Sequence, residues 1–369
     1  MKRNKQPIDK YLGWLTIILI VIGVIAFTSA SLGVLPRGES LFFNIITSQF
    51  IFGLIGGSVA LLITLWLPYT FWKKYSFYIF IGTLLMMLLV FIPGLGYEHG
   101  GAKRWVNIGF ASFQPAEFLK CGFILYGATW FSWIGKKVKD VRYSALPLFI
   151  MLGIGGVLLL LQPDTKSLVL MTVSGGAMLL VSGTPIKHIL TIAIVSIIVL
   201  GIISFSTPYI RDRINTFINP SNDPIGSSYQ IQQSLIAIGS GGVIGRGVGQ
   251  GIQKFGYLPE PQGDSIFAVV GEEVGFVGSS IIIILYALFT LRGLRIAYYA
   301  PDRFARMVVV GIIVLLWFQV FLNIASITNI IPLTGVPLVF MSHGGTSLMI
   351  SLGLVGIMLN ISKYQKETI

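Results

Sequence analysis

A glycine-rich polar segment brings one carboxylate to the beginning of a strongly apolar stretch. Between Gly226 and Gly278 the chain reads GSSYQIQQSLIAIGSGGVIGRGVGQGIQKFGYLPEPQGDSIFAVVGEEVGFVG, and Asp264 stands where the apolar residues begin. An ionisable group beside hydrocarbon costs free energy unless a reaction or a partner requires it. A carboxylate in this position can serve as a general base that takes a proton from an attacking hydroxyl. It can also simply cap the helix that follows, because Asp is a favoured N-cap residue.

The same segment has two further features that bear on chemistry. The glycines from Gly239 to Gly251 permit tight turns whose N–H groups could cradle an anion. They form neither a Walker loop, because no Gly-Lys-Ser/Thr follows, nor a dinucleotide fingerprint, because there is no βαβ context. Glu272 and Glu273 come two turns into the apolar stretch, and we expect at least one of them to pair with a cation or to face a polar cavity.

A second polar region, KRWVNIGFASFQPAEFLK at residues 103–120, precedes another apolar stretch. Pro115 suits the first turn of a helix, which places Glu117 and Lys120 one turn apart on one face. The pair can line a cavity, with Arg104 above it to meet an anion. It can equally be an ion pair that only anchors the helix.

A third polar feature is the QPD sequence at residues 162–164, between two apolar stretches. Asp164 either contributes to a site or caps the helix that follows it. Motifs of metal sites and of Ser/His/Asp catalysis give no alternative site. The three histidines show no metal-ligand spacing, and no Ser/His/Asp elbow motif occurs.

Composition indicates which elements must carry these groups. Hydrophobic residues make up 54% of the chain, charged residues 11%, and the mean hydropathy is +0.83. A soluble domain of this composition would expose its apolar surface, so the sequence predicts an all-α polytopic membrane protein with one integral membrane domain over residues 1–369. Apolar runs of roughly 20 residues predict about ten transmembrane helices. They lie near residues 12–32, 46–67, 76–93, 116–134, 143–161, 167–183, 188–207, 266–291, 307–331 and 347–361.

The distribution of Lys and Arg predicts the orientation of these helices. Most of the 26 Lys and Arg residues lie near the two termini and in alternate short connections, such as 136–142 and 292–306. Since cytoplasmic segments carry an excess of these residues, both termini are predicted to be inside. The large loop at about 208–265, between helices 7 and 8, is then extracytoplasmic. The net charge of +12 is thus a topology signal and predicts no nucleic-acid partner.

Several short patterns predict local structure. The beginning of the large loop is rich in Pro, Asn, Asp and Gly, which indicates turns rather than a continuous helix. Residues 228–238 have the apolar spacing of an amphipathic interfacial helix. The pairs Gly53/Gly57 and Gly271/Gly275 predict close helix packing. Cys121, the only cysteine, is expected to be a small buried hydrophobe. The first apolar run is too long for a cleavable signal peptide.

Together these motifs resemble the SEDS family, the shape, elongation, division and sporulation proteins that polymerise bacterial peptidoglycan strands. The resemblance covers nearly the whole chain. Its most specific parts are RWVNIGFASFQPAEFLK, the QPD sequence, residues 214–261, IFAVVGEEVGFVG and IIPLTGVPLVFMSHGGTS. The sequence QKFGYLPEP is more similar to the division branch, FtsW, than to the elongation branch, RodA.

The resemblance implies a peptidoglycan glycosyltransferase of the inverting type. Such an enzyme joins units of lipid II, the lipid-linked disaccharide-pentapeptide, at the outer face of the bacterial cytoplasmic (inner) membrane during cell division or shape maintenance. By motif position the catalytic residue is Asp264. The implied substrate-binding residues are Arg104, Gln114, Glu117, Lys120, Asp164 and Ser342.

The implied reaction also predicts partners and charge-neutralising groups. Its partners would be lipid II, the growing undecaprenyl-linked strand, a class B penicillin-binding protein and other divisome or elongasome membrane proteins. The leaving group is a lipid pyrophosphate, whose charge Arg104, Lys120 or a divalent cation such as Mg or Mn could neutralise. Hydrophobic grooves between helices would hold the polyprenyl tails.

The chain departs from the family pattern at three places. Around the acid, the usual His-Thr-Asp-Phe is Gln-Gly-Asp-Ser at residues 262–265. The usual QPDLGT is QPDTKS, which loses a glycine and gains Lys166, and the usual tyrosine of the last loop is His343.

Two functions of other classes stay open on the sequence: a lipid II flippase, and a non-enzymatic scaffold for a class B penicillin-binding protein. A transporter places its polar residues near the bilayer midplane, whereas the charges here cluster at the outer ends of the spans. A scaffold would not need Asp264.

Overall fold

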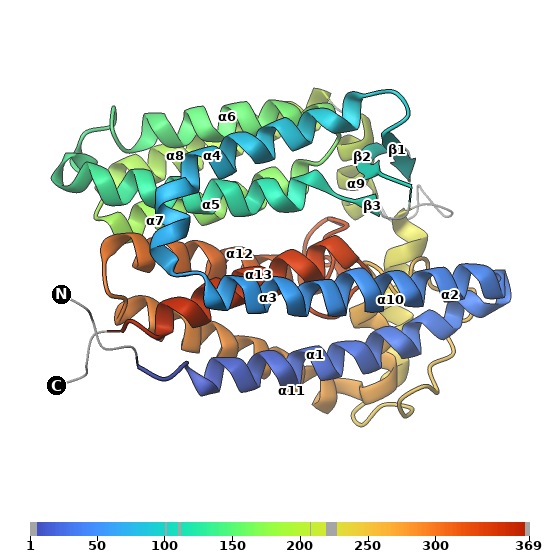
Figure 1. The fold of residues 1–369 in the computed structure, drawn as a ribbon. Helices are drawn as coiled ribbons and strands as arrows, with labels where there is room; N and C mark the ends of the chain where they lie inside the picture. The colour runs from blue at the N-terminus through green and yellow to red at the C-terminus, as the bar shows by residue number, and fades with distance from the viewer. Residues whose placement is uncertain (1–5, 100–101, 110–111, 207, 219–226, 366–369) are drawn as a thin grey trace.

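The computed structural model describes residues 6–99, 102–109, 112–206, 208–218 and 227–365, which are mostly helical (Figure 1). The α-helices are α1 (Lys10–Ser31), α2 (Glu39–Ser48), α3 (Gly56–Trp66), α4 (Tyr69–Leu88), α5 (Pro115–Ile134), α6 (Ala145–Leu161), α7 (Thr165–Ser182), α8 (Ile186–Ser206), α9 (Pro208–Ile218), α10 (Ser227–Gly241), α11 (Ile266–Tyr298), α12 (Arg303–Ile327) and α13 (Gly345–Ser362). Shorter helical segments are η1 (Leu32–Arg37), η2 (Gln49–Ile55), η3 (Leu89–Phe91) and η4 (Gly135–Lys139). The strands are β1 (Gly96–His99), β2 (Ala102–Asn107) and β3 (Ser112–Phe113).

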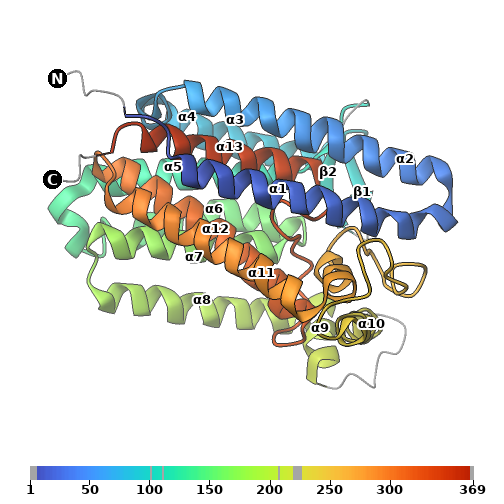
Figure 2. The same ribbon diagram turned by 90° about the horizontal axis from the view of Figure 1, so that it is seen from below.

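The long helices run side by side along one direction, and the first and last described residues lie at the same end of the bundle, where Gln6 N–H donates to Lys363 O (2.8 Å) (Figures 1 and 2). We call this the terminal end. The opposite end, here called the loop end, carries the small sheet, α9, α10 and the segment that joins α10 to α11. This arrangement brings Asp264 and the QPD turn to the same end of the molecule.

The helices have the length and composition of membrane spans. Within the described residues, seven helical stretches are long and apolar enough to cross a membrane: Lys10–Pro36, Glu39–Trp66, Tyr69–Phe91, Thr165–Ser182, Ile266–Tyr298, Arg303–Ile327 and Gly345–Ser362. Two shorter apolar helices, Ala145–Leu161 and Ile186–Val199, fall on further predicted spans. Large apolar side chains such as Trp66, Ile197 and Phe276 are exposed on the bundle. Hydrocarbon rather than water must cover a surface of this kind. The surface is therefore that of a polytopic membrane protein.

Two helices form the centre of the bundle. α12 packs against α5, α7 and α11, and α13 packs against α3. Close contact between α3, η2 and α13 depends on the glycine pair identified in the sequence. A Cβ at Gly57 would lie 2.6 Å from the Leu352 side chain, and one at Gly53 would lie 3.1 Å from Leu348. The predicted packing role of Gly53 and Gly57 is therefore confirmed.

Two elements at the loop end correct the sequence-based expectations. The chain is not entirely helical, because β1, β2 and β3 form an antiparallel sheet in that order, with Tyr97 opposite Trp105. Residues 208–218, where turns were expected, form α9. Pro208 begins this helix, a position where its missing N–H costs no hydrogen bond. The amphipathic helix expected at 228–238 is present as α10, and it packs along α11.

α11 is broken near its beginning. Gly275 has φ +66°, a left-handed conformation inside the helix, so this glycine is not simply a small packing residue. The chain after α10 fills the break, since Phe276 N–H donates to Gly242 O (2.9 Å) and Arg246 N–H donates to Glu272 O (3.0 Å). A Cβ at Gly275 would lie 2.3 Å from the backbone N of Gly245. Only glycine fits where the two segments cross.

Candidate active site

The carboxylate of Asp264 is not used to cap a helix. Ser265 occupies the N-cap position of α11, and its own side chain makes no capping hydrogen bond. In the described structure no N–H of the first turn of α11 donates to Asp264. The side chain is half-buried, so it is both reachable and partly shielded from water. This position favours the chemical interpretation of Asp264 over the capping interpretation.

Three hydrogen bonds fix the backbone that carries Asp264. His343 N–H donates to Gln262 O (2.7 Å), and the Ser342 hydroxyl donates to Gly263 O (2.8 Å). The Asn323 amide donates to Asp264 O (2.8 Å). The last loop and α12 therefore hold three consecutive carbonyls, as a preorganised base requires. Ser342 is buried and also accepts from Leu338 N–H (2.8 Å), so its hydroxyl braces this segment.

Two cations share the surroundings of this carboxylate. A Cβ added at Gly335 would lie 3.1 Å from Oδ2 of Asp264 and 3.5 Å from both terminal nitrogens of Arg213. Arg213 comes from α9 and donates to Leu333 O (2.7 Å). Lys166, in the first turn of α7, donates to Gly335 O. Asp264, Arg213 and Lys166 thus converge on one turn of the last loop.

Sequence reasoning did not single out Arg213 and noted Lys166 only as a departure from the family pattern. Arg213 lies in a segment expected to form turns, so nothing predicted which way its side chain would point. The available signal was the amphipathic pattern of residues 208–218. It would have given a helix with its basic residues at the loop end.

The QPD turn gathers three of the predicted residues. Asp164 is buried and caps α7, where it accepts from Ser167 N–H (3.3 Å) and from the Ser167 hydroxyl (2.8 Å). The side-chain amide of Gln114 also donates to Asp164, at Oδ2 (3.3 Å). Arg104 donates to Gln162 O (3.1 Å) and to Pro163 O. These contacts order the turn that precedes Lys166. The capping interpretation of Asp164 is confirmed, because its side chain accepts from Ser167 N–H.

Glu117 and Lys120 form a buried ion pair inside α5. Nζ of Lys120 lies 2.8 Å from Oε1 of Glu117, and the side chains are only 3% and 8% exposed. Pro115 occupies the first turn of α5, as the sequence predicted. The pair is near the QPD turn along the chain, because Gln114 directly precedes α5 and donates to Asp164. Each charge has its partner within the helix, which satisfies both without a ligand.

The adjacent acids of α11 are also paired, as expected. Glu273 accepts from Nζ of Lys254 (2.6 Å) and from the Ser29 hydroxyl (2.6 Å). Glu272 is fully buried and accepts from the backbone N–H groups of Ile252 (2.9 Å) and Gln253 (3.1 Å). The glycine-rich segment is therefore bonded to the beginning of α11. Asp264 directly precedes this part of the helix.

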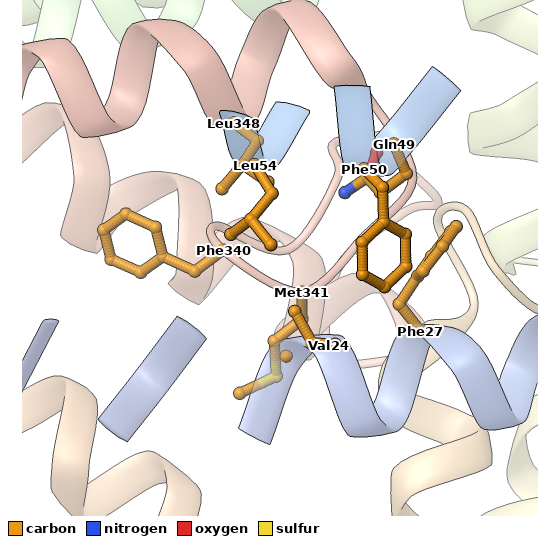
Figure 3. Close-up of a pocket in the computed structure, with 9 residues that line it drawn as sticks. Val24, Phe27, Gln49, Phe50, Leu54, Phe340, Met341 and Leu348 are labelled. Atoms are coloured by element: carbon orange, nitrogen blue, oxygen red, sulfur yellow. The ribbon is translucent and has the colours of Figure 1, made fainter. Parts of the chain in front are cut away.

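An apolar pocket lies beside the segment that braces Asp264 (Figure 3). It is nearly filled, with a cavity volume of only about 10 Å³, and its lining comes from α1, η2, the last loop and α13, including Phe27, Phe50 and Met341. Gln49 is the polar residue of the lining. Its amide donates to Ser342 O (3.1 Å) and accepts from Gly344 N–H (2.9 Å). The pocket and the site thus share the last loop.

The donor set does not favour a metal held by the protein alone. Within the residues that the structure describes, no three His, Cys, Asp or Glu side chains come together as a metal site. Asp264 shares the turn at Gly335 with two cations, Arg213 and Lys166. A divalent cation here would have to take most of its ligands from substrate phosphates and water.

Comparison with known proteins supplies the family. Residues 10–367 match the family described as cell cycle protein, FtsW/RodA/SpoVE. The chain belongs to this family. Stage V sporulation protein E of Bacillus subtilis is 36% identical over 368 residues, covering 99% of this chain and 100% of the relative. A probable peptidoglycan glycosyltransferase FtsW of Geobacter sp. is 35% identical over 360 residues, covering 98% of each chain.

Solved structures of the family share the fold. One, described as structural coordination of polymerization and crosslinking by a peptidoglycan synthase complex, matches with a TM-score of 0.79 and 25% identity, covering 97% of this chain and 99% of the other. The rod shape determining protein RodA of Thermus thermophilus matches with a TM-score of 0.70 and 24% identity, covering 97% and 98%. The family predicted from the sequence motifs is confirmed.

Proposed function

We propose that this chain is a peptidoglycan glycosyltransferase that polymerises lipid II, with Asp264 as the general base. The observation that carries the proposal is the position of the Asp264 carboxylate. It is half-buried, it does not cap α11, and its backbone is fixed by Asn323 and the last loop. The relatives named as peptidoglycan glycosyltransferases support the same activity.

The reaction uses the carboxylate as follows. A sugar hydroxyl of one substrate unit attacks the anomeric carbon of another, and its proton passes to Asp264. The new glycosidic C–O bond forms as the bond from the anomeric carbon to the pyrophosphate oxygen breaks. The pyrophosphate leaves with that electron pair. Attack from the side opposite the leaving group inverts the configuration.

The proposed topology has ten transmembrane helices, both termini in the cytoplasm and the loop end outside. The basic residues near the terminal end, such as Lys137, Lys139 and Arg303, support this orientation. The proposed location is the bacterial cytoplasmic membrane. Lipid II then meets Asp264 at the outer face.

The remaining partners are proposed on similar grounds. A class B penicillin-binding protein is the proposed partner in the membrane, since the similar chain of TM-score 0.79 comes from a peptidoglycan synthase complex. A divalent cation, Mg or Mn, is proposed only as a companion of the substrate pyrophosphate, because Asp264 could give it one protein ligand.

The flippase alternative has less support. The charged groups lie near helix ends: Asp264 precedes α11, Asp164 caps α7, and the Glu273–Lys254 pair contacts Ser29 close to the end of α1. A transporter would hold such groups at mid-helix, near the bilayer midplane.

The test is polymerisation of labelled lipid II by purified protein, with and without its cognate class B penicillin-binding protein. Asp264→Asn should lower the rate roughly hundred- to ten-thousandfold, the usual effect of removing an acid–base group. Its thermal stability should match the wild type, since no helix cap is lost. Asp212→Asn, which changes an exposed acid of α9, is the matched control and should keep full activity. An Asp264→Asn protein with the wild-type rate would refute the assignment.

A further inference from the structure

We propose that Lys166 and Arg213, placed around the turn at Gly335, form the binding site for the diphosphate of a polyprenyl-linked substrate. The inference rests on the proposed function and names the groups that receive the leaving group. It concerns residues that sequence reasoning had not assigned to any role.

The geometry places both cations and the base around the same turn, at Gly335. Gly335 lies against Oδ2 of Asp264 and against the guanidinium of Arg213, and its carbonyl accepts from Lys166. The three side chains come from separate elements: α7, α9 and the residue before α11. A turn that gathers two cations and one carboxylate from distant parts of the chain has the composition of a site for a reacting anion.

The charge balance favours a diphosphate. Lys166, Arg213 and ionised Asp264 together carry one net positive charge at this turn. A departing diphosphate gains negative charge on its bridging oxygen as the anomeric bond breaks, and nearby cations stabilise that charge most in a site partly shielded from water. Arginine suits phosphate because its planar guanidinium can contact two oxygens, whereas lysine acts as a point charge.

The cations first expected to do this are committed elsewhere. Arg104 holds the carbonyls of Gln162 and Pro163, and Lys120 is buried in its pair with Glu117. Moving Lys120 to a ligand would leave Glu117 as a buried, uncompensated charge, which costs several kcal/mol. Lys166 is half-buried and held by a single carbonyl, a contact that it can exchange for a phosphate oxygen.

Lys166 distinguishes the proposed diphosphate site of this chain from the family pattern. It stands where the motif of the resembling family has a glycine, in QPDTKS. The QPD turn sets its direction, because Asp164 caps α7 and thereby fixes the first helical turn, on which Lys166 lies. An added cation on an ordered turn beside the base is expected to strengthen diphosphate binding compared with a chain that has glycine there.

Direct binding tests the site without requiring catalysis. Radiolabelled farnesyl diphosphate is titrated onto purified full-length protein in detergent, and farnesyl monophosphate, farnesol and inorganic pyrophosphate compete. Lys166→Met and Arg213→Met should each weaken diphosphate binding roughly ten- to hundredfold, the range for losing a charge-assisted hydrogen bond. Arg213→Lys should recover part of that loss. Lys103→Met and Arg211→Met, which change exposed cations at the same end, are matched controls and should bind like the wild type.

The outcomes separate this inference from the proposed function. Unchanged binding by Lys166→Met and by Arg213→Met would overturn it, and so would competition by farnesol equal to that by the diphosphate. Competition by inorganic pyrophosphate would support recognition of the phosphates themselves. If the variants lose binding while the wild type polymerises no lipid II, the diphosphate site stands and the polymerase assignment fails.

Discussion

Removing the positive charge of Lys254 should destabilise the whole loop end. Nζ of Lys254 lies 2.6 Å from Oε1 of Glu273, and the two side chains are 0% and 4% exposed. The same ammonium also donates to the Ser29 hydroxyl (2.9 Å) and to Gly249 O (2.9 Å). Lys254→Met keeps most of the side-chain volume but leaves Glu273 buried without its cation. Breaking a buried pair in this way costs about 3–5 kcal/mol.

A double-mutant cycle separates the lost pair from lost packing. In Lys254→Met/Glu273→Gln neither member of this pair is charged, and the glutamine can still accept from Ser29. The double variant should therefore be more stable than Lys254→Met alone, since replacing both partners of a buried pair is often nearly neutral. The free energy of unfolding is measured by titrating SDS into mixed micelles and following tryptophan fluorescence.

The control and the refuting result are both specific. Lys103→Met, at an exposed lysine of β2, should change stability by less than about 0.5 kcal/mol. A Lys254→Met protein as stable as the wild type would show that the ion pair contributes nothing. If the double variant lost more unfolding free energy than the two single variants lose together, the buried charge would not be the source of the loss.

Three further predictions follow from single positions. Gly275→Ala should lower the free energy of unfolding by more than about 1–3 kcal/mol, because φ is +66° and the new Cβ would lie 2.3 Å from a backbone nitrogen; an unchanged SDS midpoint would contradict this. Gly335→Ala should lower kcat for polymerisation beyond its effect on stability, because its Cβ would lie 3.1 Å from Asp264 Oδ2; wild-type kcat would contradict it. In a Cys121→Ala background, Gln250→Cys should react with an impermeant thiol reagent in intact spheroplasts and Lys139→Cys only after lysis; the reverse pattern would contradict the proposed orientation.

The membrane-spanning helices were the most predictable part of the fold. A bilayer demands long apolar runs, so hydropathy alone located helices at the expected positions, and seven helical stretches of the described residues are long and apolar enough to cross a membrane. The pairing of Glu272 and Glu273 was predictable for the same reason, because a buried charge needs a partner. The identity of that partner, Lys254, depends on how the loop folds back.

Contacts between distant segments could not be predicted. Arg213 and Asp264 meet at Gly335 only because α9 and the last loop come together, and no periodicity encodes that meeting. Cys121 is half-buried rather than fully buried, and it packs against the core. Gly275 matched the pattern of a packing glycine, although its positive φ breaks the helix. A short motif specifies residue types, and the backbone conformation that they serve depends on tertiary structure.

The break in α11 has a consequence for inhibitors. All 33 residues of α11 would extend for about 50 Å as a continuous helix, well beyond the roughly 30 Å of hydrocarbon in a bilayer. The part from Phe276 to Tyr298, at about 34 Å, already suffices to cross. The part before Gly275, with Asp264 just ahead of it, then stands at the aqueous boundary. With the loop end outside, as proposed, a compound directed at Asp264 does not need to cross the cytoplasmic membrane and is not subject to efflux from the cytoplasm.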